Sequence, residues 1–422
     1  MSAIEPIVAF AVLLFALSLL ADRLGTLLRL PHTLVLVVMG AAVAWLLTGV
    51  LGLDTGLRAM SFHDLVFFVF LPVLVFESAY HIPVRILRDN LGVILFLAIV
   101  GMTATALVSA ALIFWGIGDA SGFPWVAALL TGALLAATDP VAVVAQLKEM
   151  GAPERLTMLL EGESLFNDAS AIVLFTVFLG VATGASADAD LGSSLLNFLG
   201  VFFGGLGVGV VAGLFGVGAL WLFRAGVGHA LIILTVAYGS FLVAEAVLHV
   251  SGILATLLAG LILARFVQRE DSPIVGSELS FVLQVLSYAA NGSVFLLVGM
   301  TLTLPMFTER WLAMLIAIGA VLVARMVIVF GAMPVLNLAI DRPVPLGYQG
   351  VMVWGGLRGA VTLALALSLP ATLDYWWTVQ AMAYGVVMFT LMLQAPTMPW
   401  LIRRTVIGPR TPDRDRTPES AD

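Results

Sequence analysis

Long, continuously apolar stretches recur along the whole chain and alternate with short polar segments. A helix needs about 20 apolar residues to cross the roughly 30 Å hydrocarbon core of a bilayer. The stretches lack the strand-length alternation of a membrane β-barrel, so each one predicts a transmembrane helix. The pattern predicts thirteen spans, at residues 4–22, 32–51, 61–80, 91–117, 123–147, 155–182, 192–223, 229–248, 252–267, 278–302, 311–338, 347–369 and 376–402.

The basic residues predict the orientation of these spans, because cytoplasmic loops of membrane proteins carry an excess of Lys and Arg. With the N-terminus outside, 15 of the 19 Lys and Arg residues fall on the cytoplasmic side. Arg58 and Arg310 fall outside, and Arg325 and Arg358 fall within spans. The C-terminus is then cytoplasmic. The first span has no basic segment before it and no small-residue cleavage site, so we expect it to be retained in the inner (cell) membrane.

Composition agrees with a chain that is surrounded mainly by lipid. Hydrophobic residues make up 61% of the 422 residues and charged residues 11%, whereas a typical soluble domain is about 25% charged. The absence of Cys excludes disulfides, thiol nucleophiles and Cys-ligated metals, and five scattered His residues leave little for a zinc site. We expect a membrane protein that is not an enzyme, without a cofactor or a nucleic-acid partner.

Few ionisable residues remain inside the predicted spans once the loops are set aside. A charge in hydrocarbon costs several kcal/mol unless it is paired or hydrated, so each is a candidate functional residue. These residues are Glu77, Asp139, Glu161, Glu163, Asp168, Glu245, Arg325 and Arg358. Four of the six acids lie within the 30 residues from Asp139 to Asp168, which predicts the functional site there.

The fifth span carries Thr138, Asp139 and Pro140 in its middle. Proline cannot donate a backbone hydrogen bond, and the residue before it is disfavoured in helical geometry. The span is therefore predicted to be broken, with unpaired carbonyls near Thr138 and the start of a half-helix near Asp139. Transporters commonly build ion sites from such broken helices, although a simple proline kink is the alternative.

The sixth span presents several oxygen-bearing side chains to this break. At helical spacing Ser164 and Asp168 share one face, and Glu163 and Asn167 share the adjacent face. Carboxylate, hydroxyl and amide groups are hard oxygen ligands that suit a small alkali cation. Glu161 shares the face of Asp168 but lies nearest the cytoplasmic end, where it is expected to be interfacial.

The twelfth span contains Arg358 among glycines, which suggests a second irregular segment. A buried Arg needs a carboxylate partner, and Glu163 is the expected one. Arg325 in the eleventh span is expected to be structural and to satisfy the carbonyls at a helix C-terminus. The pair of Glu77 and His81, and also Glu245, are expected to be interfacial.

The seventh span carries Gly205, Gly209 and Gly213 at four-residue spacing, which permits close helix packing. Six spans remain on either side of it, so it is a candidate linker between two inverted halves. No second soluble domain is expected, and residues 406–422 are predicted to form a short disordered cytoplasmic tail.

The motif Thr-Asp-Pro at 138–140, followed by Glu-Ser-Leu-Phe-Asn-Asp at 163–168, resembles the NhaP-type sodium/proton antiporters. These belong to the cation/proton antiporter superfamily, which includes the animal sodium/hydrogen exchangers. Further agreement comes from Phe-Leu-Pro at 70–72, Phe-Glu at 76–77, Ser-Gly-Ile-Leu-Ala at 251–255 and Gly-Leu-Arg-Gly at 356–359. The resemblance covers residues 1–405.

This resemblance implies an all-α membrane fold of about thirteen helices, with a six-plus-six inverted repeat and crossed broken spans 5 and 12. It implies a homodimer in the lipid bilayer, with a moving core domain (spans 4–6 and 11–13) and a dimerisation domain formed by the other spans. Regulation through a long cytoplasmic tail like that of the animal relatives is not expected.

The resemblance also implies residue roles. Asp168 would bind either the cation or the proton, and Ser164 and the Thr138 carbonyl would be further Na⁺ ligands, with Asp139 nearby. Residues that would hold the site together are Glu163, Asn167 and Arg358, and Arg325 is added as a further supporting residue.

The expected mechanism is competition between cation and proton for Asp168, combined with alternating access. Electrogenic relatives carry two adjacent aspartates, whereas this chain has Asn167 before Asp168. A single proton-carrying carboxylate implies electroneutral 1:1 Na⁺/H⁺ exchange.

Other functions remain open. A K⁺/H⁺ antiporter, or one that accepts Li⁺, would use the same ligands, because cavity size and rigidity decide which cation is bound. A cation channel would not need a titratable site. A Gly-Ile-Gly-Asp sequence at 116–119 matches that of intramembrane aspartyl proteases, but Asp119 falls in a loop.

Overall fold

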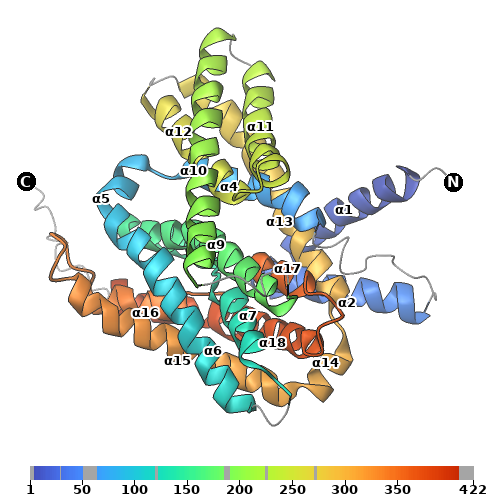
Figure 1. The fold of residues 1–422 in the computed structure, drawn as a ribbon. Helices are drawn as coiled ribbons and strands as arrows, with labels where there is room; N and C mark the ends of the chain where they lie inside the picture. Colours follow the sequence, from blue (N-terminus) through green and yellow to red (C-terminus); the bar gives the residue numbers. More distant parts are fainter. Residues whose placement is uncertain are drawn as a thin grey trace, which may run out of the picture.

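The computed structural model describes residues 4–28, 30–50, 64–118, 122–184, 191–223, 227–269 and 273–407. All regular secondary structure within these ranges is helical (Figure 1). The long apolar runs thus form helices, in which backbone groups bond to one another and need no water. The all-helical fold expected from the sequence is confirmed.

One group of helices surrounds α12 and α13. In it α10 packs against α11 and α12, α12 packs against α4, and α13 packs against α1, α2 and α4. Helices α10, α11 and α12 stand together at the top of Figure 1. The bounds of this group are α1 (Ile4–Leu28), α2 (His32–Ala44), η1 (Trp45–Val50), η2 (Leu65–Phe70), α4 (Leu71–His81), α10 (Leu191–Leu222), α11 (Val227–Leu242), η5 (Val243–Val247), α12 (Gly252–Arg269) and α13 (Pro273–Thr301).

A second group surrounds α6, α7 and α15. Here α6 packs against α7 and α15, α7 packs against α9, and α15 packs against α18. The bounds are α5 (Val84–Leu95), η3 (Phe96–Gly101), α6 (Met102–Ile117), α7 (Trp125–Ala136), α8 (Val141–Glu149), α9 (Glu154–Ala182), α14 (Leu304–Glu309), α15 (Trp311–Leu336), α16 (Leu346–Trp354), α17 (Ala360–Leu367), α18 (Trp376–Phe389), η6 (Thr390–Gln394), α19 (Ala395–Ile402) and η7 (Arg403–Ile407).

Each predicted span overlaps one or more of these helices. By length and composition, eight segments within the described residues could cross a membrane, and three shorter apolar helices lie at 32–47, 65–81 and 252–268. The eight are 84–117, 125–149, 154–182, 199–222, 228–247, 280–301, 311–336 and 376–407. The number of thirteen spans stays a prediction, and the start of the third predicted span at 61–63 lies outside the described residues.

The fourth span begins earlier than predicted, at Val84 instead of residue 91. Helix α5 places Leu87, Val93 and Ile94 in the interior while Arg88 stays exposed. Charged residues interrupt the apolar sequence at the start of α5, because an amphipathic helix keeps only one face apolar. The beginning of this helix is therefore not evident from a continuous apolar run.

The glycines of the seventh span do allow close packing, as predicted. A Cβ on Gly205 would lie 2.5 Å from the Ser251 carbonyl oxygen, and one on Gly209 would lie 2.6 Å from the Ala255 carbonyl oxygen. A Cβ on Gly213 would likewise contact Ile262. Only a residue without a side chain lets α10 approach α12 this closely.

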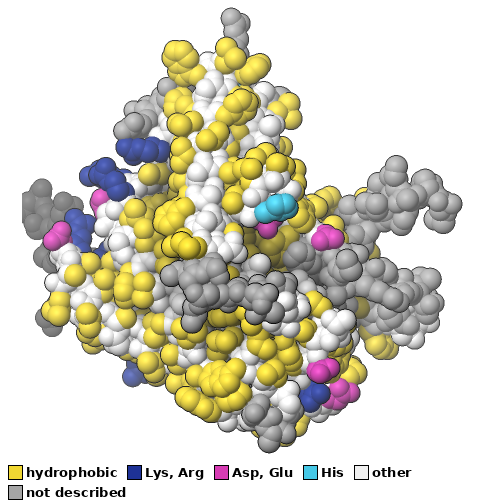
Figure 2. All heavy atoms as spheres, in the orientation of Figure 1, with side chains coloured by type: hydrophobic (Ala, Val, Ile, Leu, Met, Phe, Trp, Pro, Cys, Tyr) yellow, Lys and Arg dark blue, Asp and Glu magenta, His cyan; other side chains and the backbone are white. Residues whose placement is uncertain are grey.

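On the face shown in Figure 2, hydrophobic side chains are spread over all parts of the described surface, whereas charged side chains are few. Large apolar residues such as Trp221, Phe215 and Leu346 are exposed. An apolar surface of this extent is typical of helices that contact lipid tails.

Candidate functional site

Two helices of the second group are interrupted, and their non-helical segments meet. Helix α7 ends at Ala136 and α8 begins at Val141, so the break falls at the predicted Asp139 and Pro140. Helix α16 ends at Trp354 and α17 begins at Ala360, which confirms the predicted second irregular segment. The Asp139 N–H donates to the Leu357 carbonyl at 2.8 Å. The two breaks are therefore joined directly, backbone to backbone.

Helix α9 holds the first break through two polar side chains. The Ser164 hydroxyl donates to the Thr138 carbonyl oxygen. The Asn167 side chain accepts from the Thr138 N–H at 3.4 Å and donates to the Thr138 hydroxyl at 2.7 Å. Ser164, Asn167 and Thr138 are all buried, at 5% exposure or less. The structure thus gives Asn167 a supporting position, in which its side-chain amide fixes the backbone and hydroxyl of Thr138.

Asp139 joins the start of α8 to the second break. Its carboxylate accepts the Val141 N–H at 3.1 Å, which satisfies a donor in the first turn of α8. A Cβ added to Gly359 would lie 2.1 Å from the Asp139 carboxylate, so the absence of a side chain at Gly359 lets Asp139 fit there.

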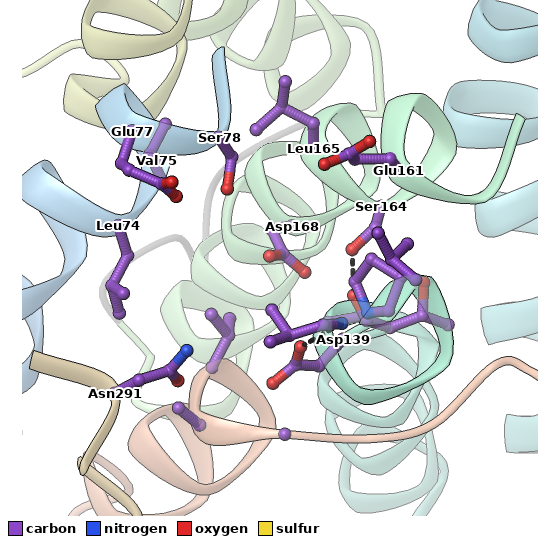
Figure 3. Close-up of a pocket in the computed structure, with 18 of the residues that line it drawn as sticks. Leu74, Val75, Glu77, Ser78, Asp139, Glu161, Ser164, Leu165, Asp168 and Asn291 are labelled. Atoms are coloured by element: carbon purple, nitrogen blue, oxygen red, sulfur yellow. Dashed lines mark hydrogen bonds between the residues drawn. The ribbon is translucent and has the colours of Figure 1, made fainter. Parts of the chain in front are cut away.

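The break opens onto a cavity of about 330 Å³. Asp139, Ser164 and Asp168 line it together with Thr138. Figure 3 shows the Asp168 carboxylate in the open space between Asp139 and the helix that carries Ser78. The four residues predicted to bind the cation or the proton therefore surround one cavity. They offer it carboxylate, hydroxyl and carbonyl oxygens, which are hard ligands.

The predicted ion pair between Glu163 and Arg358 is wrong: Glu163 pairs with Arg325. Two nitrogens of the Arg325 guanidinium donate to the two carboxylate oxygens of Glu163, one of them at 2.9 Å. The same guanidinium also donates to the Met352 carbonyl at 3.2 Å, in the last turn of α16. Glu163 is 1% exposed and Arg325 is 5% exposed. Arg325 thus connects α9, α15 and α16.

Arg358 also satisfies carbonyls at a helix C-terminus, the role predicted for Arg325 and confirmed by the contact of Arg325 with the Met352 carbonyl. One terminal nitrogen of Arg358 donates to the carbonyls of Ala136 and Ala137, at 2.6 and 2.7 Å. These are the unpaired carbonyls where α7 ends, and a cation there also opposes the negative end of the helix dipole. Arg358 is 1% exposed. Arg358, which lies in the second break, therefore binds and stabilises the first break.

Glu77 is closer to the site than expected. It was expected to be interfacial, but it lines the same cavity as Asp168. It pairs with His81 at 3.0 Å and accepts a hydrogen bond from Ser287 of α13 at 3.4 Å. Sequence spacing could not reveal this position, because Glu77 lies on α4 in the other helix group. Asn291 of α13 lines the cavity as well, which its sequence context does not indicate.

The remaining acids are placed as follows. Glu161 lies 3.7 Å from the exposed Lys148, and both line the cavity, which fits a position near its opening. Glu245 accepts the Gly252 N–H at 2.9 Å and so caps the start of α12. Asp119, on which the protease alternative depends, lies outside the described residues.

A family comparison agrees with this architecture. The model of the transmembrane sodium/hydrogen exchanger family matches residues 9–404. The chain belongs to this family. The resemblance to NhaP-type antiporters inferred from the motifs is therefore confirmed.

Named relatives carry the comparison further. The chain is 35% identical to the Na(+)/H(+) antiporter ApNhaP of Aphanothece halophytica, over 92% of this chain and 72% of that protein. It is 33% identical to the Na(+)/H(+) antiporter NhaP of Pseudomonas aeruginosa, over 83% and 84% respectively. Among solved structures, the sodium proton antiporter MjNhaP1 of Methanocaldococcus jannaschii has the same fold, with a TM-score of 0.77 at 20% identity. That match covers 96% of this chain and 99% of that chain.

Proposed function

We propose that the chain is a secondary transporter that exchanges Na⁺ for H⁺ across a cell (inner) membrane. One observation carries this proposal. Asp168 lies in an open cavity next to Ser164 and to the Thr138 carbonyl at a broken helix. The names of the family relatives, which are Na(+)/H(+) antiporters, support Na⁺ and H⁺ as the exchanged ions.

The proposed chemistry is competition for Asp168. An ionised carboxylate attracts a partly dehydrated cation, and the hydroxyl of Ser164 and the Thr138 carbonyl replace part of its hydration shell. A protonated carboxylate is neutral and loses that attraction. Either loaded form is close to neutral and can cross, whereas the empty ionised form carries an uncompensated charge through a low-dielectric region. Cation and proton are then exchanged without ATP.

The proposed stoichiometry is one Na⁺ for one H⁺, so that transport is electroneutral. Asn167 occupies the position of the first aspartate of the electrogenic relatives, and both ends of its amide are engaged with Thr138. The Asp139 carboxylate accepts a hydrogen bond from the Val141 N–H in the first turn of α8. Asp168 is left as the carboxylate that alternates between proton and cation.

Alternating access requires two bodies that move against each other. We propose a core domain built from spans 4–6 and 11–13, a dimerisation domain built from the remaining spans, and an inverted repeat that relates the two breaks. The grouping of helices supports this division, since α7, α9, α15 and α18 pack with one another while α4, α10, α12 and α13 form the other group. The cavity lies between the two groups.

The extent of the cavity indicates that the protein is open to one side of the membrane in this conformation. Its lining runs from Asp168 to Glu161 and the exposed Lys148. Lys148 falls on the predicted cytoplasmic side, so we assign this structure to the inward-open state of an N-out, C-in protein.

Reconstituted flux tests this function. In proteoliposomes with a pH gradient, we expect Na⁺ to collapse the gradient for the wild type and not for Asp168→Asn. Asp341→Asn is the matched control, because Asp341 is an exposed aspartate outside the cavity. Retained exchange in Asp168→Asn contradicts the assignment. A response to K⁺ but not to Na⁺ makes the protein a K⁺/H⁺ antiporter, and cation flux that ignores the pH gradient makes it a channel.

A further inference from the structure

The cavity has a second wall, which belongs to the other helix group. Asp168, Ser164 and Thr138 line one side, whereas α4 and α13 line the opposite side. On that opposite wall lies Asn291, which is half-buried in the second half of α13. Figure 3 shows its amide pointing into the cavity from the helix facing Asp139 and Asp168.

Two of the other polar residues of the α4 and α13 wall, Glu77 and Ser287, have partners. Glu77 is paired with His81, and Ser287 donates to Glu77. For the Asn291 amide, no hydrogen bond to any residue in the described part of the chain is recorded, and the same holds for the Ser78 hydroxyl. A half-buried amide without a protein partner keeps its full capacity for a ligand or for water. Of the two, Asn291 carries the stronger oxygen ligand for a cation, a carbonyl oxygen.

We infer that Asn291 supplies an oxygen to the coordination or hydration shell of the transported cation, from the wall opposite Asp168, in the inward-open state. This inference rests on the proposed Na⁺/H⁺ exchange. An amide oxygen is a hard, neutral ligand of the same chemical type as the Thr138 carbonyl. It adds to the binding of a small alkali cation without changing the charge of the site, so the exchange stays electroneutral.

The position of Asn291 makes its contribution specific to one side of the membrane. The remaining predicted ligands all come from α7–α8 and α9, which move together in the proposed mechanism. Helix α13 packs against α1, α2 and α4 in the other group. When the core moves past α13, the cation leaves the reach of Asn291. The amide therefore strengthens cation binding from the inner side and not from the outer side.

Side-specific kinetics test this inference. With Asn291→Ala in everted vesicles, where the cytoplasmic face is outward, we expect the KM for Na⁺ to rise by about three- to tenfold, which corresponds to one lost polar contact. In right-side-out vesicles the KM for Na⁺ should stay within about twofold of the wild type, a difference too small to count as one such contact. Gln284→Ala is the control, because it removes an amide from the same helix outside the cavity.

A second substitution separates the oxygen from the amide nitrogen. Asn291→Asp keeps an oxygen at the same position and removes the donor, so it should bind Na⁺ from the inner side at least as tightly as the wild type. If the amide instead donates to Asp139, Asn291→Asp will be as weak as Asn291→Ala or weaker, which overturns the inference. Asn291→Leu, of similar size, replaces Asn291→Ala should the latter not fold.

Two further outcomes are decisive. An equal change of KM on both sides, or no change on either side, contradicts the role of Asn291 while wild-type exchange and its loss in Asp168→Asn leave the proposed function intact. Absence of Na⁺-dependent proton flux in the wild type contradicts the proposed function itself.

Discussion

At the scale of single residues, the site is a set of buried polar groups whose hydrogen bonds are made by specific partners. Glu163 and Arg325 neutralise each other, Arg358 satisfies the end of α7, and Asn167 fixes Thr138. Asp168, in contrast, faces an open cavity. The supporting residues thus have protein partners, whereas the Asp168 carboxylate faces the cavity, as its proposed role in ion binding requires.

The buried pair of Glu163 and Arg325 should be costly to break. Glu163→Gln leaves the Arg325 charge buried without a counter-charge, and we expect a loss of about 3–5 kcal/mol in the free energy of unfolding. The double variant Glu163→Gln with Arg325→Met should regain much of that loss, because no unpaired charge remains. Thermal denaturation of the purified protein in detergent measures both, with the exposed Glu154→Gln on the same helix as control. Equal stability of Glu163→Gln and the control would show that the pair does not hold α9 to α15.

Asn167 should act through the geometry of Thr138. Asn167→Ala removes both hydrogen bonds to Thr138, and we expect the KM for Na⁺ to rise about tenfold because the Thr138 carbonyl, a proposed Na⁺ ligand, loses its fixed position. Asn167→Asp should retain part of the affinity, since a carboxylate can accept from both the N–H and the hydroxyl of Thr138. Flux assays at several Na⁺ concentrations measure this, and an unchanged KM in Asn167→Ala would contradict this role of Asn167.

At the scale of elements, the two breaks form one unit. The Asp139 N–H bonds to the Leu357 carbonyl, Arg358 bonds to carbonyls at the end of α7, and Asp139 fits against Gly359. Each break supplies partners for backbone groups that the other leaves unpaired. This explains how irregular backbone is stable inside a membrane protein, because each break finds hydrogen-bond partners within the protein.

The contact at Gly359 gives a test of this unit. Gly359→Ala places a methyl group 2.1 Å from the Asp139 carboxylate, so one of the breaks must shift. We expect Gly359→Ala to lose most of its exchange activity while the protein still folds. Gly350→Ala on the neighbouring half-helix is the control, because no atom lies within 4 Å of its added Cβ. Normal flux in Gly359→Ala would show that the approach of Asp139 to Gly359 is dispensable.

The sequence was sufficient for some of these elements and not for others. The break at Asp139 and Pro140 follows from local chemistry, because proline excludes a helical hydrogen bond and restricts the residue before it. The close packing of α10 follows from the spacing of its glycines, although their contact with α12 does not. Whether Glu163 faces Arg325 or Arg358 depends on how α9, α15 and α17 cross. Glu77 and Asn291 line the cavity from helices that are distant in sequence, so their positions also depend on how the helices cross.

At the scale of the whole molecule, the two helix groups enclose the cavity between them. The charged residues that the sequence keeps inside the spans are concentrated on the group that contains the breaks, whereas α4 and α13 supply Glu77 and Asn291. If the proposed ion site lies on the group that contains the breaks, a rocking movement of that group past α4 and α13 would carry the ion from one side to the other.

Electroneutral exchange is a property of the whole transport cycle. If one proton replaces one Na⁺, a cycle moves no net charge, and the membrane potential exerts no force on it. Imposing a K⁺/valinomycin potential of either sign on proteoliposomes should therefore leave the rate of Na⁺-driven proton movement unchanged. A rate that rises with one sign of the potential and falls with the other would establish unequal stoichiometry.

Proton release on Na⁺ binding tests directly whether Na⁺ and H⁺ compete for Asp168. Purified protein in weakly buffered detergent solution is prepared at a pH where the site is protonated, and NaCl is added while the pH is recorded, with choline chloride as the control for ionic strength. Competition at a single carboxylate predicts release of about one proton per bound Na⁺, as expected for linked binding. It predicts no release from Asp168→Asn. Na⁺ binding without proton release, or equal release from Asp168→Asn, would contradict it.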